Sequence, residues 1–296
     1  MPLTRWRRDP RSQAMAEMLA YNEFREFNRF LNGLIGLNGV ASWAEEEYGP
    51  ELGYYLTLYI RNLVSATIIY YTMGIVWSWM VERSEMVFGM EVFKGGEVKR
   101  PGSIQDQMIL AQMSLFLYAG LPVFDEFLIE YGCTKVYMSM SEVGGFVPYV
   151  FYTIVYFLLV EVGIYWVHRK LHTNEFLYKY IHKLHHKYNT PDYLSPWASI
   201  AFNPIDGILQ ACPYTIVMCF WPCHYITHFV MLFLTAIWAT NIHDTLVGDT
   251  EPLMGSKYHT VHHTHYNCNY GQYLVLCDYM WGTLRQPAKD KTEKTQ

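Results

Sequence analysis

A long stretch without charge limits the folds open to this chain more than any other feature. Residues 63–80 contain no charged side chain, and about 20 such residues cross the roughly 30 Å apolar core of a membrane as one helix. Only 17% of all residues are charged and 51% are hydrophobic, which favours a membrane protein with several spans over a soluble domain. We therefore predict an all-α fold, a polytopic bundle of membrane helices.

Further apolar stretches predict additional spans. Residues 108–124 form a second, weaker span that could instead be re-entrant, and residues 146–167 form a third that only Glu161 interrupts. The apolar residues 205–222 and 225–242 follow each other almost without a linker. They must therefore form a helical hairpin that returns to the side from which it entered.

Charge and cysteine content exclude two classes of protein. The formal net charge of −5 leaves no basic surface for phosphates, so we expect no nucleic-acid partner. The six cysteines are scattered and form no CxxC pair, which indicates reduced, structural thiols rather than a disulfide framework.

The histidines are the most unusual feature, because all twelve lie between His168 and His265. Eight of them form three clusters: His168 and His172; His182, His185 and His186; and His259, His262 and His263. Residues three and four apart share a helix face, so each cluster is expected to aim two or three imidazoles at one point. Eight ligand nitrogens are more than the four that one tetrahedral zinc binds, and their number suits two metals with five or six ligands each. The clusters therefore predict a two-metal centre.

The remaining histidines differ in what they can reach. His243 directly follows the returning arm of the hairpin, which places it beside the clusters as a ninth ligand. His224 and His228 lie at the far tip of the hairpin, too distant to reach the metals, and we interpret them as structural histidines at the opposite membrane interface. His265 is expected to point away from the ligand face of its segment.

The chemistry of the ligands indicates iron. A zinc hydrolase would carry a carboxylate base within its motif, as in HExxH, and no cluster holds one. Imidazole-rich, open sites suit redox-active iron that binds O₂, and an apolar membrane substrate with unactivated C–H bonds requires such an oxidant. A histidine-rich metal transporter is the alternative from another class, but its ligands would line a path at mid-membrane rather than lie at the ends of spans.

The three clusters, in this order and spacing, resemble those of the fatty acid hydroxylase and sterol desaturase superfamily of membrane di-iron enzymes. Within it, the connecting sequence is similar to the Δ7-sterol C5(6)-desaturases, particularly the plant type, in the runs Glu161-Val-Gly-Ile-Tyr-Trp-Val-His-Arg, Leu194-Ser-Pro, Phe202-Asn-Pro-Ile-Asp-Gly-Ile-Leu-Gln-Ala, Asn241-Ile-His-Asp, Tyr258-His-Thr-Val-His-His-Thr, Asn269-Tyr-Gly and Trp281-Gly-Thr-Leu-Arg. The similarity covers roughly residues 144–287. Two positions depart from the family pattern, His265 and Cys277, and neither is a predicted ligand.

The resemblance implies an activity and its requirements. The enzyme would introduce the C5(6) double bond into a Δ7-sterol taken from the bilayer, with two iron ions as cofactor and O₂ as co-substrate. Electrons would come from cytochrome b5 and its NAD(P)H-linked reductase, in the endoplasmic reticulum membrane. The family ligands carry over onto His168, His172, His182, His185, His186, His259, His262 and His263, and His243 matches a further family histidine. A C4-methyl sterol oxidase or a lipid hydroxylase of the same superfamily stays open as the alternative.

These inferences divide the chain into four parts. Residues 1–62 form an N-terminal polar or amphipathic region, 63–143 the first two membrane segments with their loops, 144–287 the domain that resembles the di-iron superfamily, and 288–296 a disordered tail. Five basic residues lie in the histidine-rich segment between residues 169 and 187, against only Lys135 in the 129–145 loop. The histidine clusters are therefore expected to face the cytosol, which makes the basic N-terminal tail luminal and leaves the number of preceding spans open.

Four other residues are candidates for supporting the centre. Glu161 lies two turns before His168, where it either orients a ligand, meets a substrate hydroxyl or extends to the lipid interface. Asp206 and Asp244 lie at span ends as helix caps or as partners of ligand imidazoles. Thr190 either lines the site or belongs to the turn before Pro191.

Overall fold

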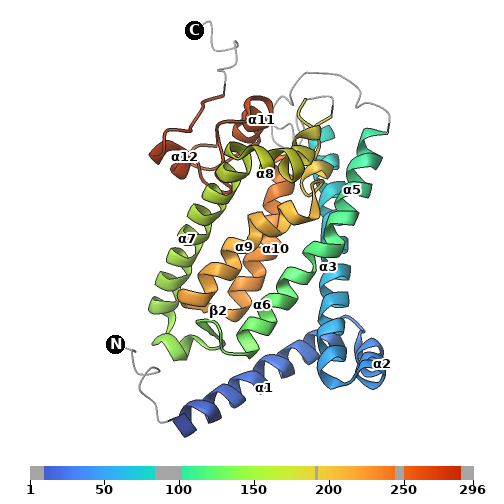
Figure 1. Cartoon of the computed structure of the whole chain (residues 1–296), viewed down its shortest axis with the longest axis vertical. Coiled ribbons are helices and arrows are strands. Elements are labelled where there is room, and N and C mark those ends of the chain that lie inside the picture. Colours follow the sequence, from blue (N-terminus) through green and yellow to red (C-terminus); the bar gives the residue numbers. More distant parts are fainter. Residues whose placement is uncertain (1–9, 84–101, 191–192, 244–249, 288–296) are drawn as a thin grey trace, which may run out of the picture. The chain divides into compact units, whose positions relative to one another are not determined.

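The computed structural model describes residues 10–83, 102–190, 193–243 and 250–287. These residues are almost entirely helical (Figure 1). The one paired sheet among them consists of two-residue strands, β1 (Val136–Tyr137) and β2 (Cys223–His224), which run parallel. The prediction of an all-α fold is confirmed.

The α-helices of the described residues are, in chain order, α1 (Pro10–Leu34), α2 (Asn38–Tyr48), α3 (Pro50–Glu82), α5 (Ser103–Tyr118), α6 (Gly120–Glu130), α7 (Phe146–Thr173), α8 (Glu175–Tyr180), α9 (Pro204–Phe220), α10 (Tyr225–Ile242), α11 (Ser256–His265) and α12 (Leu276–Met280). Three short 3-10 helices accompany them: η2 (Met140–Val143), η3 (His182–Lys187) and η4 (Pro196–Ala198).

Four segments of the described chain are long and apolar enough to cross a membrane: Pro50–Glu82, Ser103–Glu130, Phe146–Thr173 and Tyr225–Ile242. Helix α9 is apolar but shorter. The first three predicted spans therefore recur with longer boundaries, the segment 225–242 recurs with the predicted ones, and the segment 205–222 corresponds to the shorter α9. Helix α3 begins well before residue 63, since Pro50 suits the first turn of a helix and Glu51 interacts favourably with its N-terminus.

The predicted second span is divided at Ala119, where α5 ends and α6 begins. Pro122 explains the break, because it lacks the N–H that would bond to the carbonyl of Tyr118 in a continuous helix. In the first turn of α6 the missing N–H costs nothing.

The chain forms two compact units that interleave along the sequence. The first comprises Met1–Ile68, Leu115–Val160 and Cys212–Phe233, and the second comprises Ile69–Ser114, Glu161–Ala211 and Leu234–Gln296. Helices α3, α5, α7, α9 and α10 each contribute a part to both units. All nine histidines predicted as ligands belong to the second unit.

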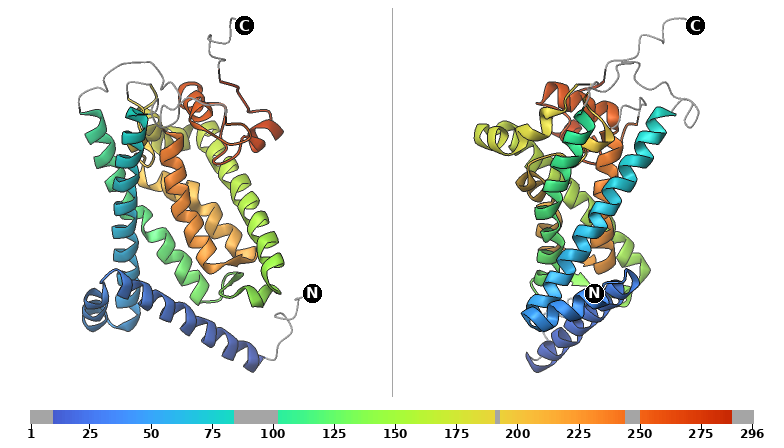
Figure 2. Two further views of the ribbon diagram at one scale, coloured as in Figure 1. Left: turned by 180° about the vertical axis from the view of Figure 1, so that it is seen from behind. Right: turned by 90° about the vertical axis from the view of Figure 1, so that its right-hand side faces the viewer.

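In the first unit, α1 contacts α2 and α6 (Figure 2). Helix α6 brings carboxylates into this interior, and each has a partner. Glu126 accepts hydrogen bonds from the Asn28 amide, at 3.0 Å, and from the Tyr225 hydroxyl. Glu130 accepts from the Arg25 guanidinium at 3.1 Å and from Tyr55 at 2.7 Å. These bonds offset the cost of burying charge and fix α6 against its neighbours.

His228, predicted as a structural histidine, lies fully buried in the first unit. Its Nε2 atom is 3.1 Å from Asp125 Oδ2 and its Nδ1 atom is 2.7 Å from the Tyr156 hydroxyl. Asp125 on α6 supplies a buried partner that the sequence pattern of the hairpin does not reveal. The structural role expected for His228 agrees with these contacts.

In the second unit, the segment around η4 anchors two helices. The Tyr70 hydroxyl of α3 donates to the carbonyl of Trp197 at 2.9 Å, and the Gln107 amide of α5 donates to the carbonyl of Tyr193 at 2.7 Å. Gly74 permits the close approach, because a methyl group there would lie 2.5 Å from the Trp197 ring. The start of α9, which carries Asp206, is held next to this segment.

Candidate metal centre

Four parts of the second unit carry the nine candidate rings. Helix α7 places His168 and His172 one turn apart, η3 and α11 carry the two HxxHH triplets, and His243 directly follows α10. Asn174 separates α7 from α8 by capping the new helix, with its side chain accepting from the Leu177 N–H at 3.0 Å. Eight of the nine histidines are buried, and His172 is partly exposed.

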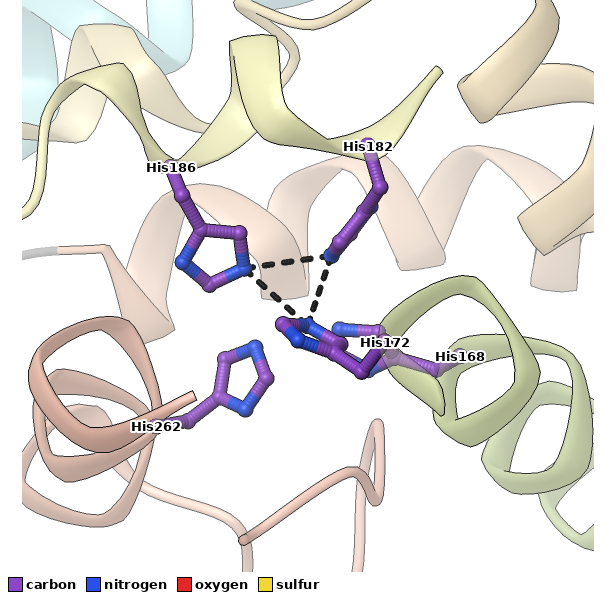
Figure 3. Close-up of side chains that lie close together, drawn as sticks. All are labelled: His168, His172, His182, His186 and His262. Atoms are coloured by element: carbon purple, nitrogen blue, oxygen red, sulfur yellow. Dashed lines mark hydrogen bonds between the residues drawn. The ribbon is translucent and has the colours of Figure 1, made fainter. Parts of the chain in front are cut away.

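Five rings converge in what we call the His168 group: His168, His172, His182, His186 and His262 (Figure 3). One ring nitrogen of each lies within 4.8 Å of those of the others. The Nε2 atoms of His172 and His182 are 2.9 Å apart, and both lie 3.1 Å from that of His186. Three separate elements therefore direct their nitrogens to one point.

The other four rings form the His243 group: His185, His243, His259 and His263. The Nε2 atom of His243 lies 3.1 Å from that of His259, 3.3 Å from that of His263 and 3.4 Å from that of His185. Both groups consist of histidines alone within the part of the chain that the structure describes.

Each HxxHH triplet divides between the groups, which differs from the prediction that its three rings share one point. His182 and His186 join the His168 group while His185 joins the His243 group. In α11 the pair His259 and His263 joins the His243 group while His262 joins the other. In the α-helix α11, residues four apart lie on one face, whereas adjacent residues are turned by about 100°. One triplet can thus serve two sites.

Four rings have their second nitrogen held by an oxygen: His168 by Tyr270 O at 3.0 Å, His262 by Cys268 O at 2.7 Å, His182 by Asp206 Oδ2 at 2.8 Å and His243 by Ala239 O at 2.7 Å. In each case the nitrogen is Nδ1. An oxygen of this kind accepts a hydrogen bond, so Nδ1 carries the proton and Nε2 offers its lone pair to the group.

The protonation state also suits metal ligands. Burial lowers the pKa of His243 to about 4 and that of His262 to about 3. Burial, together with the neighbouring rings, lowers the pKa of His185, His186, His259 and His263 well below the usual value. These rings are therefore neutral near pH 7, the form that binds a metal.

Two observations show that the His168 group fits a metal ion. The Nε2 atoms of His168 and His262 are buried and have no hydrogen-bond partner among the described residues, a costly state that a cation would relieve. In addition, two nitrogens each about 2.1 Å from one ion lie roughly 3.0 Å apart at a right angle, close to the 2.9 and 3.1 Å found here. A donor set of imidazoles alone suits a transition metal and not Ca²⁺ or Mg²⁺.

The four supporting candidates occupy different places. Asp206 contacts His182 directly and is fully buried. Glu161 accepts hydrogen bonds from the main-chain N–H groups of residues 272, 273 and 274 and contacts no ligand ring through them. Thr190 is exposed, and its carbonyl closes a turn by accepting from the N–H of Tyr193 at 2.8 Å. Asp244 lies outside the described residues.

The sequence did not predict the hydrogen-bond acceptors of His168 and His262, because these acceptors are main-chain carbonyls. The signal available was indirect: the Asn269-Tyr-Gly run lies directly after the third cluster. Asn269 adopts a φ of 55°, a left-handed conformation that asparagine tolerates better than most residues. Its side chain bonds to the carbonyls of Tyr258 and Arg285, both at 3.0 Å, which fixes the turn after α11.

The fold and the site define a class: helical membrane proteins whose polar end holds two adjacent groups of buried histidines able to bind metals. The fatty acid hydroxylase family model matches residues 153–283, the part of the chain that carries all nine rings. No solved structure matches the chain.

Comparison with known proteins narrows the class. The chain is 35% identical to a Delta(7)-sterol-C5(6)-desaturase of Nicotiana tabacum, over 92% of this chain and 97% of that protein. It is 39% identical to a putative Delta(7)-sterol-C5(6)-desaturase 2 of Arabidopsis thaliana, over 81% and 85%, and 32% identical to a lathosterol oxidase of Rattus norvegicus, over 67% and 68%. The chain therefore belongs to the fatty acid hydroxylase family, in its branch of Δ7-sterol C5(6)-desaturases.

Proposed function

We propose that this protein is a membrane desaturase that uses O₂ to introduce the C5(6) double bond into Δ7-sterols. The observation that carries the proposal is the pair of histidine-only groups in a chain whose desaturase relatives match it over most of its length. Two hydrogens leave adjacent sterol carbons, and O₂ with two added electrons and two protons becomes two molecules of water.

The cofactor that suits these groups is a pair of iron ions, one held by the His168 group and the other by the His243 group. When bound, iron supplies the redox chemistry that activates O₂ toward an unactivated C–H bond. Family membership supports iron, and so does the absence of carboxylates from both groups among the described residues.

The residues of the chain orient the ligands and shield them. Asp206 and three main-chain carbonyls hold Nδ1–H of four rings, so that each presents Nε2. Aromatic rings cover the His168 group: Tyr270 packs 5.4 Å from His172, and Tyr266 packs 5.1 Å from His186, measured between ring centroids. This cover limits access of water to the reacting centre.

The remaining parts of the proposal concern partners and location. The sterol enters from the bilayer, and electrons come from cytochrome b5 and its NAD(P)H-linked reductase. We place the enzyme in the endoplasmic reticulum membrane with its histidines on the cytosolic side, as the distribution of Lys and Arg favours. Within the division of the chain given above, residues 144–287 would act as the catalytic domain.

Sterol analysis tests the function. Expressed in yeast that lacks its own C5(6)-desaturase, the chain is expected to restore 5,7-diene sterols, whereas the His263→Ala variant at equal abundance is not. Accumulation of Δ7-sterols in cells with folded, iron-loaded wild-type protein would reject the substrate. Loss of C4-methyl groups or new sterol hydroxyls would instead indicate an oxidase or hydroxylase of the same superfamily.

A further inference from the structure

Two buried carboxylates bind consecutive main-chain N–H groups of the segment 270–274, which follows α11. Asp278 accepts from the N–H groups of Tyr270 and Gly271, both at 2.8 Å. Glu161 accepts from the next three, those of residues 272, 273 and 274, at 3.1, 3.1 and 2.9 Å. All five successive N–H groups are thus satisfied by two side chains from different helices, α12 and α7.

In this arrangement the oxygens of both carboxyl groups act as acceptors, because every partner is a donor. Glu161 is 2% exposed and Asp278 is fully buried, so both would be costly without these bonds. Thr283 adds a hydroxyl that donates to Asp278 at 2.7 Å. Gly271 is needed at the centre, since a methyl group there would lie 2.2 Å from the carbonyl oxygen of Leu274 and 3.2 Å from Asp278 Oδ2.

The same segment holds a ligand of the His168 group. The carbonyl of Tyr270, the first clamped residue, accepts from Nδ1 of His168 at 3.0 Å. Two residues earlier, the carbonyl of Cys268 accepts from Nδ1 of His262 at 2.7 Å. Glu161 and His168 are both on α7. This one helix therefore binds the N–H groups of the segment through Glu161 and donates to the Tyr270 carbonyl through His168.

We propose that Glu161 and Asp278 are positioning residues for the metal in the His168 group. They clamp the 270–274 segment, the segment fixes the Tyr270 carbonyl, and the carbonyl fixes the tautomer and orientation of His168. The effect is selective, because the Nδ1 partner of His243 in the other group is the carbonyl of Ala239 on its own helix, α10. The inference rests on the proposed function, in that it requires metals in both groups.

Metal counting on the purified full-length protein in detergent tests the clamp. An amide at either position places an NH₂ group against a main-chain N–H, because both oxygens of each carboxyl group accept from one. Glu161→Gln and Asp278→Asn are therefore expected to weaken binding in the His168 group by about 10- to 100-fold. After competition with a chelator that leaves both metals in the wild type, each variant should retain about one metal per chain instead of about two.

Second substitutions identify the depleted site. Glu161→Gln combined with His259→Ala, which disrupts the His243 group, is expected to retain almost no metal, whereas Glu161→Gln combined with His172→Ala should still hold about one. Asp125→Asn is the matched control, since it replaces a fully buried, hydrogen-bonded carboxylate of the first unit and should leave both metals bound.

The outcomes separate the clamp from the function. Folded Glu161→Gln and Asp278→Asn proteins that keep both metals with wild-type chelator resistance would overturn the clamp. So would equal loss from both groups, or the same loss in Asp125→Asn, since either would indicate general destabilisation. If Glu161→Gln yields no folded protein, Asp278→Asn and Gly271→Ala carry the same prediction. A wild-type protein that binds no metal would instead contradict the proposed function.

Discussion

His185 and His186 are adjacent in the chain, yet their rings serve different groups. The two ring planes meet at 85°, with centroids 5.5 Å apart. His186 approaches His172 at 3.1 Å between Nε2 atoms, and His185 approaches His243 at 3.4 Å. The 3-10 helix η3 therefore contributes to both groups, and its displacement would disturb them together.

This relationship predicts that His185→Ala and His186→Ala each abolish sterol desaturation, although each removes a ring from only one group. The expected fall in product is at least about 100-fold, because losing a ligand costs no less than losing the group that orients it. The measurement is the ratio of 5,7-diene to Δ7-sterol in the yeast strain at matched protein abundance. His265→Ala is the control, since His265 is exposed and belongs to neither group; an equal loss in that variant would argue against the assignment.

Asp206 is expected to strengthen metal binding through His182. Asp206→Ala removes the acceptor of the His182 Nδ1–H, 2.8 Å away, so metal affinity in the His168 group should fall about 10- to 100-fold. Chelator titration of purified protein measures this change. Asp206→Asn, whose amide oxygen can still accept, should lie between the alanine variant and the wild type. An alanine variant with wild-type affinity would show that the carboxylate does not act on the ligand.

The buried network of the first unit predicts a loss of stability. Asp125→Ala leaves the Thr215 hydroxyl and the His228 Nε2 atom without their carboxylate, at 2.6 and 3.1 Å. Each buried donor without an acceptor costs about 1–3 kcal/mol, so the thermal midpoint in detergent should fall. Protein folded at low temperature should keep both metals. An unchanged midpoint would mean that water replaces the carboxylate.

Close packing of α3 predicts a second, chemically different loss of stability. Gly74→Ala places a methyl group 2.5 Å from the Trp197 ring, an overlap that costs about 1–3 kcal/mol. Gly39→Ala is the matched control, because no atom lies within 4 Å of the added methyl group and alanine favours the helix. Thermal unfolding of both variants should therefore shift in opposite directions. A stabilised Gly74→Ala protein would contradict the packing described here.

The sequence predicted those features that side-chain type and spacing record directly. Residues 63–80 carry no charge and residues 146–167 carry only Glu161, as expected for segments that face lipid, and they lie within α3 and α7. The structure brings together the nine histidines suggested by spacing and by the hairpin argument. Residues such as His243 could be placed because a short link leaves a hairpin few alternatives.

Features that depend on partners far apart in the chain were not predictable. Asp125 lies 103 positions from His228, and nothing in either local sequence indicates that they meet. The division of each HxxHH triplet was missed because spacing alone does not say on how many sides of a helix a metal can lie. Glu161 stood out as a costly intramembrane charge, but its partners are main-chain N–H groups, which every sequence contains.

The most direct test of the two-site centre is the iron content of the purified full-length protein after anaerobic loading with Fe²⁺ and removal of loosely bound metal. We expect about two iron ions per wild-type chain and about one in either His186→Ala or His263→Ala, since each variant disables one group. Wild-type protein with one iron or none, or single variants that keep both, would contradict the assignment of one metal to each group of histidines.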